Sequence, residues 1–152
     1  MIRKLGIVVA ATAAGVLGFA GPAQAQLIEG TNGPDVLIGT PNNDTIRGFA
    51  AGDFEAGQNG SDSMYGGNGA DEMLGGRHND SMYGGNGGDA MTGNVGSDLV
   101  LGQAGPDRVI GADGNDDVRG GNSADTVRGN DQADEVSPGP GADEAFGGRG
   151  ND

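Results

Sequence analysis

The chain contains no cysteine and no tryptophan, and it has only one lysine and one histidine among 152 residues. Without cysteine there can be neither a disulfide framework nor a thiolate zinc site. The lysine, Lys4, lies outside any phosphate-binding P-loop motif, and the single histidine, His78, excludes the two-histidine helix of a zinc metalloprotease. No G-x-S-x-G nucleophile motif is present. These absences exclude several enzyme classes.

Large apolar side chains are also scarce. Hydrophobic residues make up 34% of the chain and aromatic residues only 4%, whereas 34 positions are glycine and 6 are proline. This composition is typical of low-complexity or disordered chains unless the glycines recur at a fixed period. Any folded core must therefore be thin, and the spacing of the glycines decides whether one forms.

The first 25 residues have the pattern of a cleaved secretory signal peptide. Arg3 and Lys4 give a basic start, residues 5–20 form an uncharged and mostly apolar run, and the small-x-small motif AQA ends at Ala25. A membrane anchor is the alternative, but this run is short for a span of about 20 residues. We therefore expect cleavage after Ala25, an extracellular mature protein that begins at Gln26, and no insertion of that protein into a membrane.

The chain is strongly acidic. Eight basic residues face 22 acidic ones, for a net charge of −14, and loss of the two basic residues in the signal peptide lowers the charge to −16. Such a chain repels the phosphates of nucleic acids and anionic lipids, so we expect no nucleic-acid partner. It attracts cations, and the placement of the acidic residues decides whether they form binding sites.

Aspartate recurs at every ninth residue through the mature chain. From Gly30 the sequence divides into nonapeptides without an insertion or deletion, most clearly in residues 57–92. Position one is Gly in thirteen of the fourteen nonapeptides, and position four is Gly in nine. Position six is always Asp: Asp35, Asp44, Asp53, Asp62, Asp71, Asp80, Asp89, Asp98, Asp107, Asp116, Asp125, Asp134, Asp143 and Asp152. A fixed period of this kind indicates a solenoid of one repeated unit.

Position eight holds an apolar residue in almost every nonapeptide. The exception is Glu55. The other residues in this position are Leu37, an isoleucine, four methionines, five valines and Ala145. Apolar residues that recur between clusters of Gly, Asn and Asp predict short strands joined by turns, with position eight pointing inward. Ile28 falls in the same position ahead of the first glycine, so residues 26–29 are predicted to form an opening strand.

This pattern closely resembles the RTX (repeats-in-toxin) nonapeptide G-G-x-G-x-D-x-U-x, in which U is a large apolar residue, over residues 30–152. The resemblance implies an all-β fold, a right-handed parallel β-roll (a β-solenoid) in which two nonapeptides complete one coil. In each repeat the first six residues would form a metal-binding turn and the last three a short strand. Residues eighteen apart would then stack, with Met73 over Met91 and Tyr65 over Tyr83.

The metal that the resemblance implies is Ca²⁺, bound as several ions between stacked turns. Carboxylates and backbone carbonyls suit this hard cation, whereas Mg²⁺ demands a tight octahedron and zinc or copper would need His or Cys. Stacked aspartates repel one another by roughly 1 kcal/mol per pair even in water, so the chain is expected to fold only when calcium binds. The candidate ligands are Asp35, Asp44, Asp53, Asp62, Asp71, Asp80, Asp89, Asp98, Asp107, Asp116, Asp125, Asp134 and Asp143.

Several turns depart from the family pattern. Glu55 puts a carboxylate in an inward position beside the irregular turn 48–53, and Pro138 replaces a position-one glycine. His78 replaces a position-four glycine and is interpreted as a tolerated turn substitution, because a lone histidine has no companion ligand. We therefore expect the best calcium sites within residues 57–125 and looser coils before them.

The function that follows is calcium binding by a secreted, non-enzymatic protein, because the repeats leave no room for a catalytic domain. The alternative is a surface-exposed structural, adhesion or ice-binding solenoid in which calcium is only a structural staple. Ice binding is disfavoured because the outward positions hold no threonine ladder, and Tyr65, Tyr83 and Leu74 mark the surface expected for adhesion. The last repeat stops at Asp152 without a cap, so end-to-end self-association, or an unknown cell-surface partner, is a further hypothesis.

Overall fold

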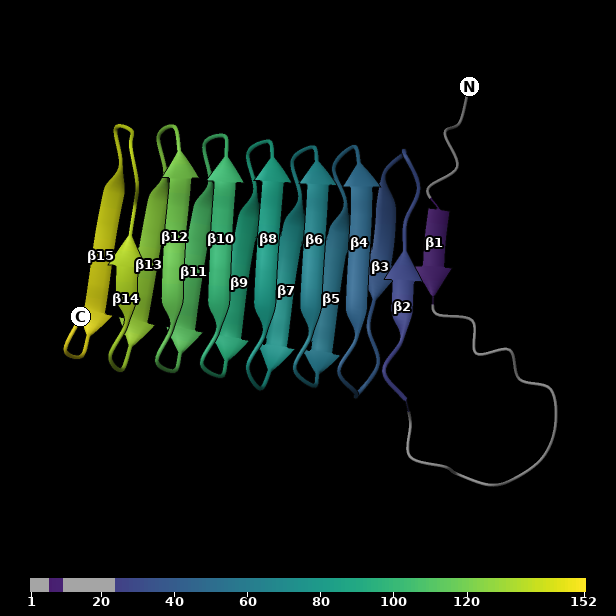
Figure 1. The fold of residues 1–152 in the computed structure, drawn as a ribbon, viewed down its shortest axis with the longest axis horizontal. Coiled ribbons are helices and arrows are strands. Elements are labelled where there is room, and N and C mark those ends of the chain that lie inside the picture. The colour runs from purple at the N-terminus through teal and green to yellow at the C-terminus, as the bar shows by residue number, and fades with distance from the viewer. Residues whose placement is uncertain (1–5, 10–23) are drawn as a thin grey trace, which may run out of the picture.

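Two parallel β-sheets lie face to face along the repeat region, and the chain passes from one sheet to the other at every turn (Figure 1). The computed structural model describes residues 6–9 and 24–152. Within these residues every regular element is a strand, and no helix is long and apolar enough to span a membrane. The all-β β-roll expected from the sequence is therefore confirmed.

Consecutive strands alternate between the two sheets. The eight-stranded sheet contains the odd-numbered strands: β1 (Gly6–Val9), β3 (Asp35–Ile38), β5 (Phe54–Asn59), β7 (Glu72–Arg77), β9 (Ala90–Val95), β11 (Arg108–Asp113), β13 (Thr126–Asp131) and β15 (Glu144–Arg149). The seven-stranded sheet contains the even-numbered strands: β2 (Leu27–Glu29), β4 (Thr45–Ala50), β6 (Ser63–Asn68), β8 (Ser81–Asn86), β10 (Leu99–Ala104), β12 (Asp117–Asn122) and β14 (Glu135–Ser137).

The register between neighbouring strands of the repeat region is eighteen residues throughout. Met73 in β7 pairs with Met91 in β9, and Tyr65 in β6 pairs with Tyr83 in β8, as the sequence predicts. One coil therefore contains two nonapeptides. Equivalent positions of alternate repeats lie directly above one another, so whatever one turn places at its surface or interior is repeated along the rod.

Most strands are twice as long as the three residues expected from the sequence. β6, for example, begins at Ser63 in position seven and ends at Asn68 in position three of the next repeat. Its ladder with β8 includes Tyr65 opposite Tyr83 and resumes with Gly67 opposite Gly85. Because similar turns are stacked, their backbones also hydrogen-bond to one another, and the pairing continues past the apolar residue into the glycines.

A single column of inward side chains forms the core. Its members occupy position eight and are no more than 2% exposed: Ile28, Leu37, Ile46, Met64, Met73, Met82, Met91, Val100, Val109, Val118 and Val127. Val136 is only partly buried and Ala145 is exposed, so the core thins toward β14 and β15. Because each repeat contributes about one side chain to this core, the stability of a coil depends heavily on its turns.

Part of the predicted signal peptide falls within the described residues. Gly6–Val9 forms β1, which pairs in parallel with β3, whereas residues 1–5 and 10–23 lie outside the described part of the chain. The predicted opening strand is present as β2. Cleavage after Ala25 stays a prediction; it would remove β1 and leave β3 as the first strand of its sheet.

Candidate metal-binding turns

The position-six aspartates lie inside the turns. Their exposed fractions are only 2% to 6% from Asp35 to Asp134. Asp143 is half-buried and Asp152 is exposed, where the core also thins. Because successive repeats alternate between the sheets, the aspartates form two columns, one leading into the strands of each sheet.

One carboxylate oxygen of each aspartate from Asp53 onward joins successive coils. The backbone N–H of Asp71 donates a hydrogen bond of 2.9 Å to Asp89 Oδ1, and the N–H of Asp89 donates one of 2.8 Å to Asp107 Oδ1. The same bond joins all twelve pairs of aspartates that lie eighteen residues apart. The stacked columns expected from the sequence are confirmed, and each is a continuous hydrogen-bond ladder.

The other carboxylate oxygen has no hydrogen-bond partner in most turns. Ten Oδ2 atoms are buried and unpartnered: those of Asp53, Asp62, Asp71, Asp80, Asp89, Asp98, Asp107, Asp116, Asp125 and Asp134. An unpartnered buried polar atom costs about 1–3 kcal/mol, and more when it is charged. Such atoms are rare in folded proteins, and a regular series of them indicates a common ligand.

Eight of the ten unpartnered Oδ2 atoms face a backbone carbonyl across a position-one glycine. A Cβ atom built on Gly75 would lie 2.6 Å from Asp80 Oδ2 and 2.6 Å from the carbonyl oxygen of Gly93 in the next coil. The same convergence occurs at Gly57, Gly66, Gly84, Gly102 and Gly129. Only glycine leaves this space to the oxygens, which explains why position one is almost always Gly.

A left-handed backbone at two positions gives the turns this shape. Positions two and four have positive φ in the regular turns, as at Gly67 (108°) and Gly69 (142°). In the turn 48–53, Phe49 (79°) and Ala51 (75°) adopt the same conformation without being glycine, at a cost of order 1 kcal/mol each. The turn that looks irregular in sequence therefore follows the backbone course of its neighbours.

The first two turns are built differently. Thr31 donates to Asp35 Oδ2 from its backbone N–H (2.5 Å) and its hydroxyl (2.9 Å), and Thr40 makes the same two bonds, of the same lengths, to Asp44 Oδ2. Neither threonine has a positive φ. The Oδ2 atoms of Asp35 and Asp44 therefore have a hydrogen-bond partner within the protein, whereas those of the later aspartates up to Asp134 have none. Metal binding by Asp35 and Asp44 stays a prediction.

Burial is the main influence on the acidity of the columns. It raises the pKa from 3.8 to about 6 for Asp53, Asp62, Asp89 and Asp116, and to about 7 for Asp80 and Asp107. The hydrogen bond to Oδ1 opposes this rise, and the negative charges of stacked aspartates add to it. A proton therefore binds these carboxylates far more readily than it binds an exposed aspartate.

Glu55 is the one acidic side chain in the core column. It lies in β5 between Leu37 and Met73 and is 0% exposed, and both of its carboxylate oxygens are unpartnered. Burial raises its pKa to about 8, the negative charges of Asp71 and Asp53 add to this, and the nearby Gly48 N–H, which does not form a hydrogen bond with the carboxylate, opposes it. The inward position predicted for Glu55 is confirmed.

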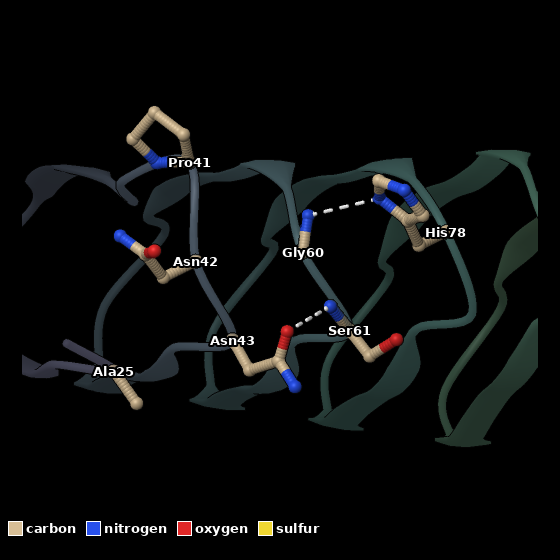
Figure 2. Close-up of a pocket in the computed structure, with 7 residues that line it drawn as sticks. All are labelled: Ala25, Pro41, Asn42, Asn43, Gly60, Ser61 and His78. Atoms are coloured by element: carbon tan, nitrogen blue, oxygen red, sulfur yellow. Dashed lines mark hydrogen bonds between the residues drawn. The ribbon is translucent and has the colours of Figure 1, made fainter. Parts of the chain in front are cut away.

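His78 lies beside an open pocket lined by neutral residues (Figure 2). Its Nδ1 atom is 3.2 Å from the backbone nitrogen of Gly60 and 2.8 Å from the carbonyl oxygen of Arg77. No carboxylate lines this pocket, and within residues 6–9 and 24–152 no three acidic or histidine side chains converge as a metal cluster. A cation in the turns would therefore be held by one or two carboxylates together with backbone carbonyls.

The surface that the sequence suggests for adhesion is divided between the two sheets. Tyr65 and Tyr83 stack on the seven-stranded sheet, with ring centroids 5.0 Å apart and planes inclined by 4°. Leu74 lies in β7, in the eight-stranded sheet. The stacked tyrosines are confirmed, but Leu74 does not extend their surface because odd and even repeats face opposite ways.

The repeat matches a known family along nearly its whole length. A family model described as the RTX calcium-binding nonapeptide repeat matches residues 29–54, 56–91, 92–127, 110–145 and 119–152. The chain belongs to this family. Together the matches cover residues 29–152 except for Glu55. A search of curated proteins found no match.

The RTX turns of this chain fit calcium. Ca²⁺ accepts six to eight oxygen ligands in flexible geometry, and most regular turns offer an unpartnered Asp Oδ2 and a position-one carbonyl that face one space. The residues that would hold the ions are the ten aspartates from Asp53 to Asp134, together with position-one backbone carbonyls of the next coil. Bound calcium would supply the positive charge that the two columns of buried carboxylates lack.

Two features of these turns were missed when the sequence was considered alone. One is the hydrogen bonding of Thr31 and Thr40 to the aspartates of their own turns. The sequence signal for it was a residue with a hydroxyl group in position two of the first two repeats. The other is the approach of the Glu55 carboxylate to the Asp53 turn. A residue in position eight is expected to pack into the core, and nothing in a linear pattern shows that a long side chain turns back toward position six.

Proposed function

We propose that this RTX protein is a secreted, non-enzymatic calcium-binding protein that folds when it meets extracellular calcium. The observation that carries the proposal is the series of ten buried, unpartnered Oδ2 atoms, eight of which face a backbone carbonyl of the next coil. Calcium converts each unfavourable carboxylate into a ligand, so binding and folding become one process. The family of the repeat supports calcium as the ion.

The extracellular location is part of the proposal and rests on the signal-peptide pattern of residues 1–25. Extracellular calcium modules bind with dissociation constants of about 10⁻⁴–10⁻³ M. Such a site stays empty at the low calcium concentration of the cytoplasm and fills outside the cell. The chain would therefore leave the cytoplasm unfolded and gain its rod-like structure after export.

Isothermal titration calorimetry with Ca²⁺ and with Mg²⁺ tests the proposal. Ca²⁺ should bind at sub-millimolar to millimolar concentration, with no more than ten ions per chain, one for each unpartnered Oδ2. Mg²⁺ at the same concentration should give little heat, because a carbonyl-rich turn cannot provide its compact octahedron. Equal binding of the two cations would show that they only screen the acidic columns, and the proposal would fail.

The Asp89→Asn variant tests whether the aspartates act as stacked columns. Asn keeps an oxygen that can accept the N–H of Asp71 but replaces the anionic Oδ2 in the middle of the rod. In a solenoid each unit is stabilised by its neighbours, so loss of an interior ligand interrupts the whole array. Because calcium affinity follows ligand charge, we expect the calcium midpoint to rise by roughly tenfold and its cooperativity to fall, measured by circular dichroism.

Two control variants remove the same charge elsewhere. Asp113→Asn changes an exposed residue of the same sheet and should leave the midpoint nearly unchanged. Asp44→Asn changes a carboxylate whose Oδ2 already accepts two bonds from Thr40, and it should shift the midpoint less than Asp89→Asn does. Three equal shifts would mean that only net charge matters and that no stacked column exists.

A further inference from the structure

Glu55 interrupts the apolar column, and its carboxylate reaches the metal-binding turn that precedes its strand. It is fully buried between Leu37 and Met73, and neither of its oxygens has a hydrogen-bond partner. A glutamate that served only to fill the core would be expected to pair its carboxylate with a donor. Its two free oxygens therefore require a ligand of their own.

The Glu55 carboxylate is directed at the same space as the ligands of the third turn. A Cβ atom built on Gly48 would meet three oxygens: Asp53 Oδ2, the Gly66 carbonyl oxygen at 2.7 Å and Glu55 Oε1 at 2.9 Å. At a regular turn only two oxygens converge. Beside Gly75, for example, the next atom after the two oxygens is a carbon, Asp80 Cγ, at 3.2 Å.

The backbone around this space is that of a complete turn. Phe49 and Ala51 hold the left-handed conformation of the regular repeats, and Asp53 Oδ1 accepts the ladder bond from the N–H of Asp35 at 2.8 Å. Glu55 is thus an addition to an intact turn and not a replacement for a missing part. When both carboxyl groups are ionised, Asp53 and Glu55 provide two negative charges, which balance one divalent cation.

We propose that Glu55 is a second carboxylate ligand of a calcium site formed by Asp53, Glu55 and the Gly66 carbonyl, and that this site fills first. Calcium affinity increases with the number of charged ligands, and the regular turns offer one carboxylate where this turn offers two. The first ion would order the coil between β4 and β7, and later ions would bind to turns stacked on an ordered neighbour. The inference rests on the proposed calcium-binding function and adds the order in which the sites fill.

The Glu55→Met and Glu55→Gln variants of the full chain test this site. Equilibrium dialysis with radioactive calcium gives the free Ca²⁺ concentration at which one ion is bound per chain. We expect this concentration to be at least about tenfold higher in both variants than in the native protein, because one charged ligand is lost. Circular dichroism in saturating calcium should show the same β-sheet content for all three proteins.

The methionine variant separates ligation from simple misfit. Met occupies position eight in the next four repeats, so Glu55→Met restores a continuous apolar column. If Glu55 were only a poorly accommodated core residue, this change would stabilise the fold and lower the calcium requirement. A first ion that binds Glu55→Met as tightly as the native protein, or more tightly, would overturn the proposal.

Glu72→Gln provides a charge-matched control, since Glu72 is exposed in the neighbouring strand β7. Its first-ion affinity should equal that of the native protein, and a loss as large as that of Glu55→Gln would attribute the effect to net charge and overturn the proposal. If the native protein binds no calcium at all, the proposed function itself fails. If it binds several ions with one uniform affinity that Glu55→Gln does not change, only the inference about Glu55 fails.

Discussion

In excess chelator at neutral pH, the purified protein is expected to give the circular dichroism spectrum of a disordered chain, and millimolar Ca²⁺ should restore a β-sheet spectrum in one cooperative transition. Thirteen buried carboxylate oxygens, ten of them aspartate Oδ2 atoms, have no hydrogen-bond partner within the described residues. At about 1–3 kcal/mol for each unpartnered polar atom, and more for charged ones, their cost reaches the whole stability of an ordinary domain, about 5–15 kcal/mol.

The core is too narrow to offset that cost. Eleven fully inward side chains form one column, and glycine-rich turns lose more conformational entropy on folding than other segments do. Calcium changes the balance at every turn at once, because it binds the folded arrangement of oxygens and not the unfolded chain. The midpoint is expected near the extracellular calcium range of about 10⁻⁴–10⁻³ M.

The chelated protein is also the control for this experiment. Addition of sodium chloride to the same ionic strength screens the aspartate columns without providing a ligand, and it should leave the spectrum disordered. A β-sheet spectrum that persists in excess chelator at neutral pH would show that the core and the ladder bonds hold the fold by themselves. Coupling of folding to calcium would then be wrong.

Acid should partly replace calcium. In the folded chain the pKa values of six aspartates lie at about 6 or about 7 instead of 3.8, and that of Glu55 lies at about 8 instead of 4.5. The folded state therefore binds more protons than the unfolded state between about pH 4 and pH 8. Stability falls as pH rises through this window and increases as pH is lowered through it.

The expected result is a gain of β-sheet signal as a calcium-free sample is titrated from pH 8 to pH 4. Protonation removes both the charge repulsion within the columns and the cost of burying each charge. Because several carboxyl groups with raised pKa values bind protons together, the transition should be steep. Below about pH 4 the carboxylates are protonated in both states, and no further gain is expected.

Sedimentation velocity should accompany this titration, because acid lowers the net charge and a β-sheet signal from aggregates must be distinguished from that of the monomer. Acid should also weaken calcium binding, since protons and calcium compete for the same oxygens. A monomer that stays disordered at every pH without calcium would show that burial does not raise these pKa values as the structure indicates.

The sequence by itself determines the architecture of this protein. Asp at every ninth residue and an apolar residue two places later indicate a solenoid with an inward apolar column and a recurring Asp turn, because a solenoid repeats one local unit. The resemblance to the RTX repeat implies that two nonapeptides complete one coil. The pairings of Met73 with Met91 and of Tyr65 with Tyr83 follow from that two-repeat coil. The family of the chain follows from the same pattern.

Tertiary structure decided what each aspartate does. The sequence treats Asp35, Asp44 and Asp89 alike, yet Thr31 and Thr40 satisfy the first two, while Asp89 keeps a buried oxygen free. It also treats Glu55 as a defect, whereas the folded chain brings its carboxylate to the oxygens around Gly48. The repeat pattern indicates which residues stack. Whether two stacked groups form a hydrogen bond depends on differences of a few tenths of an ångström in the distance between their atoms, and only the folded chain sets these distances.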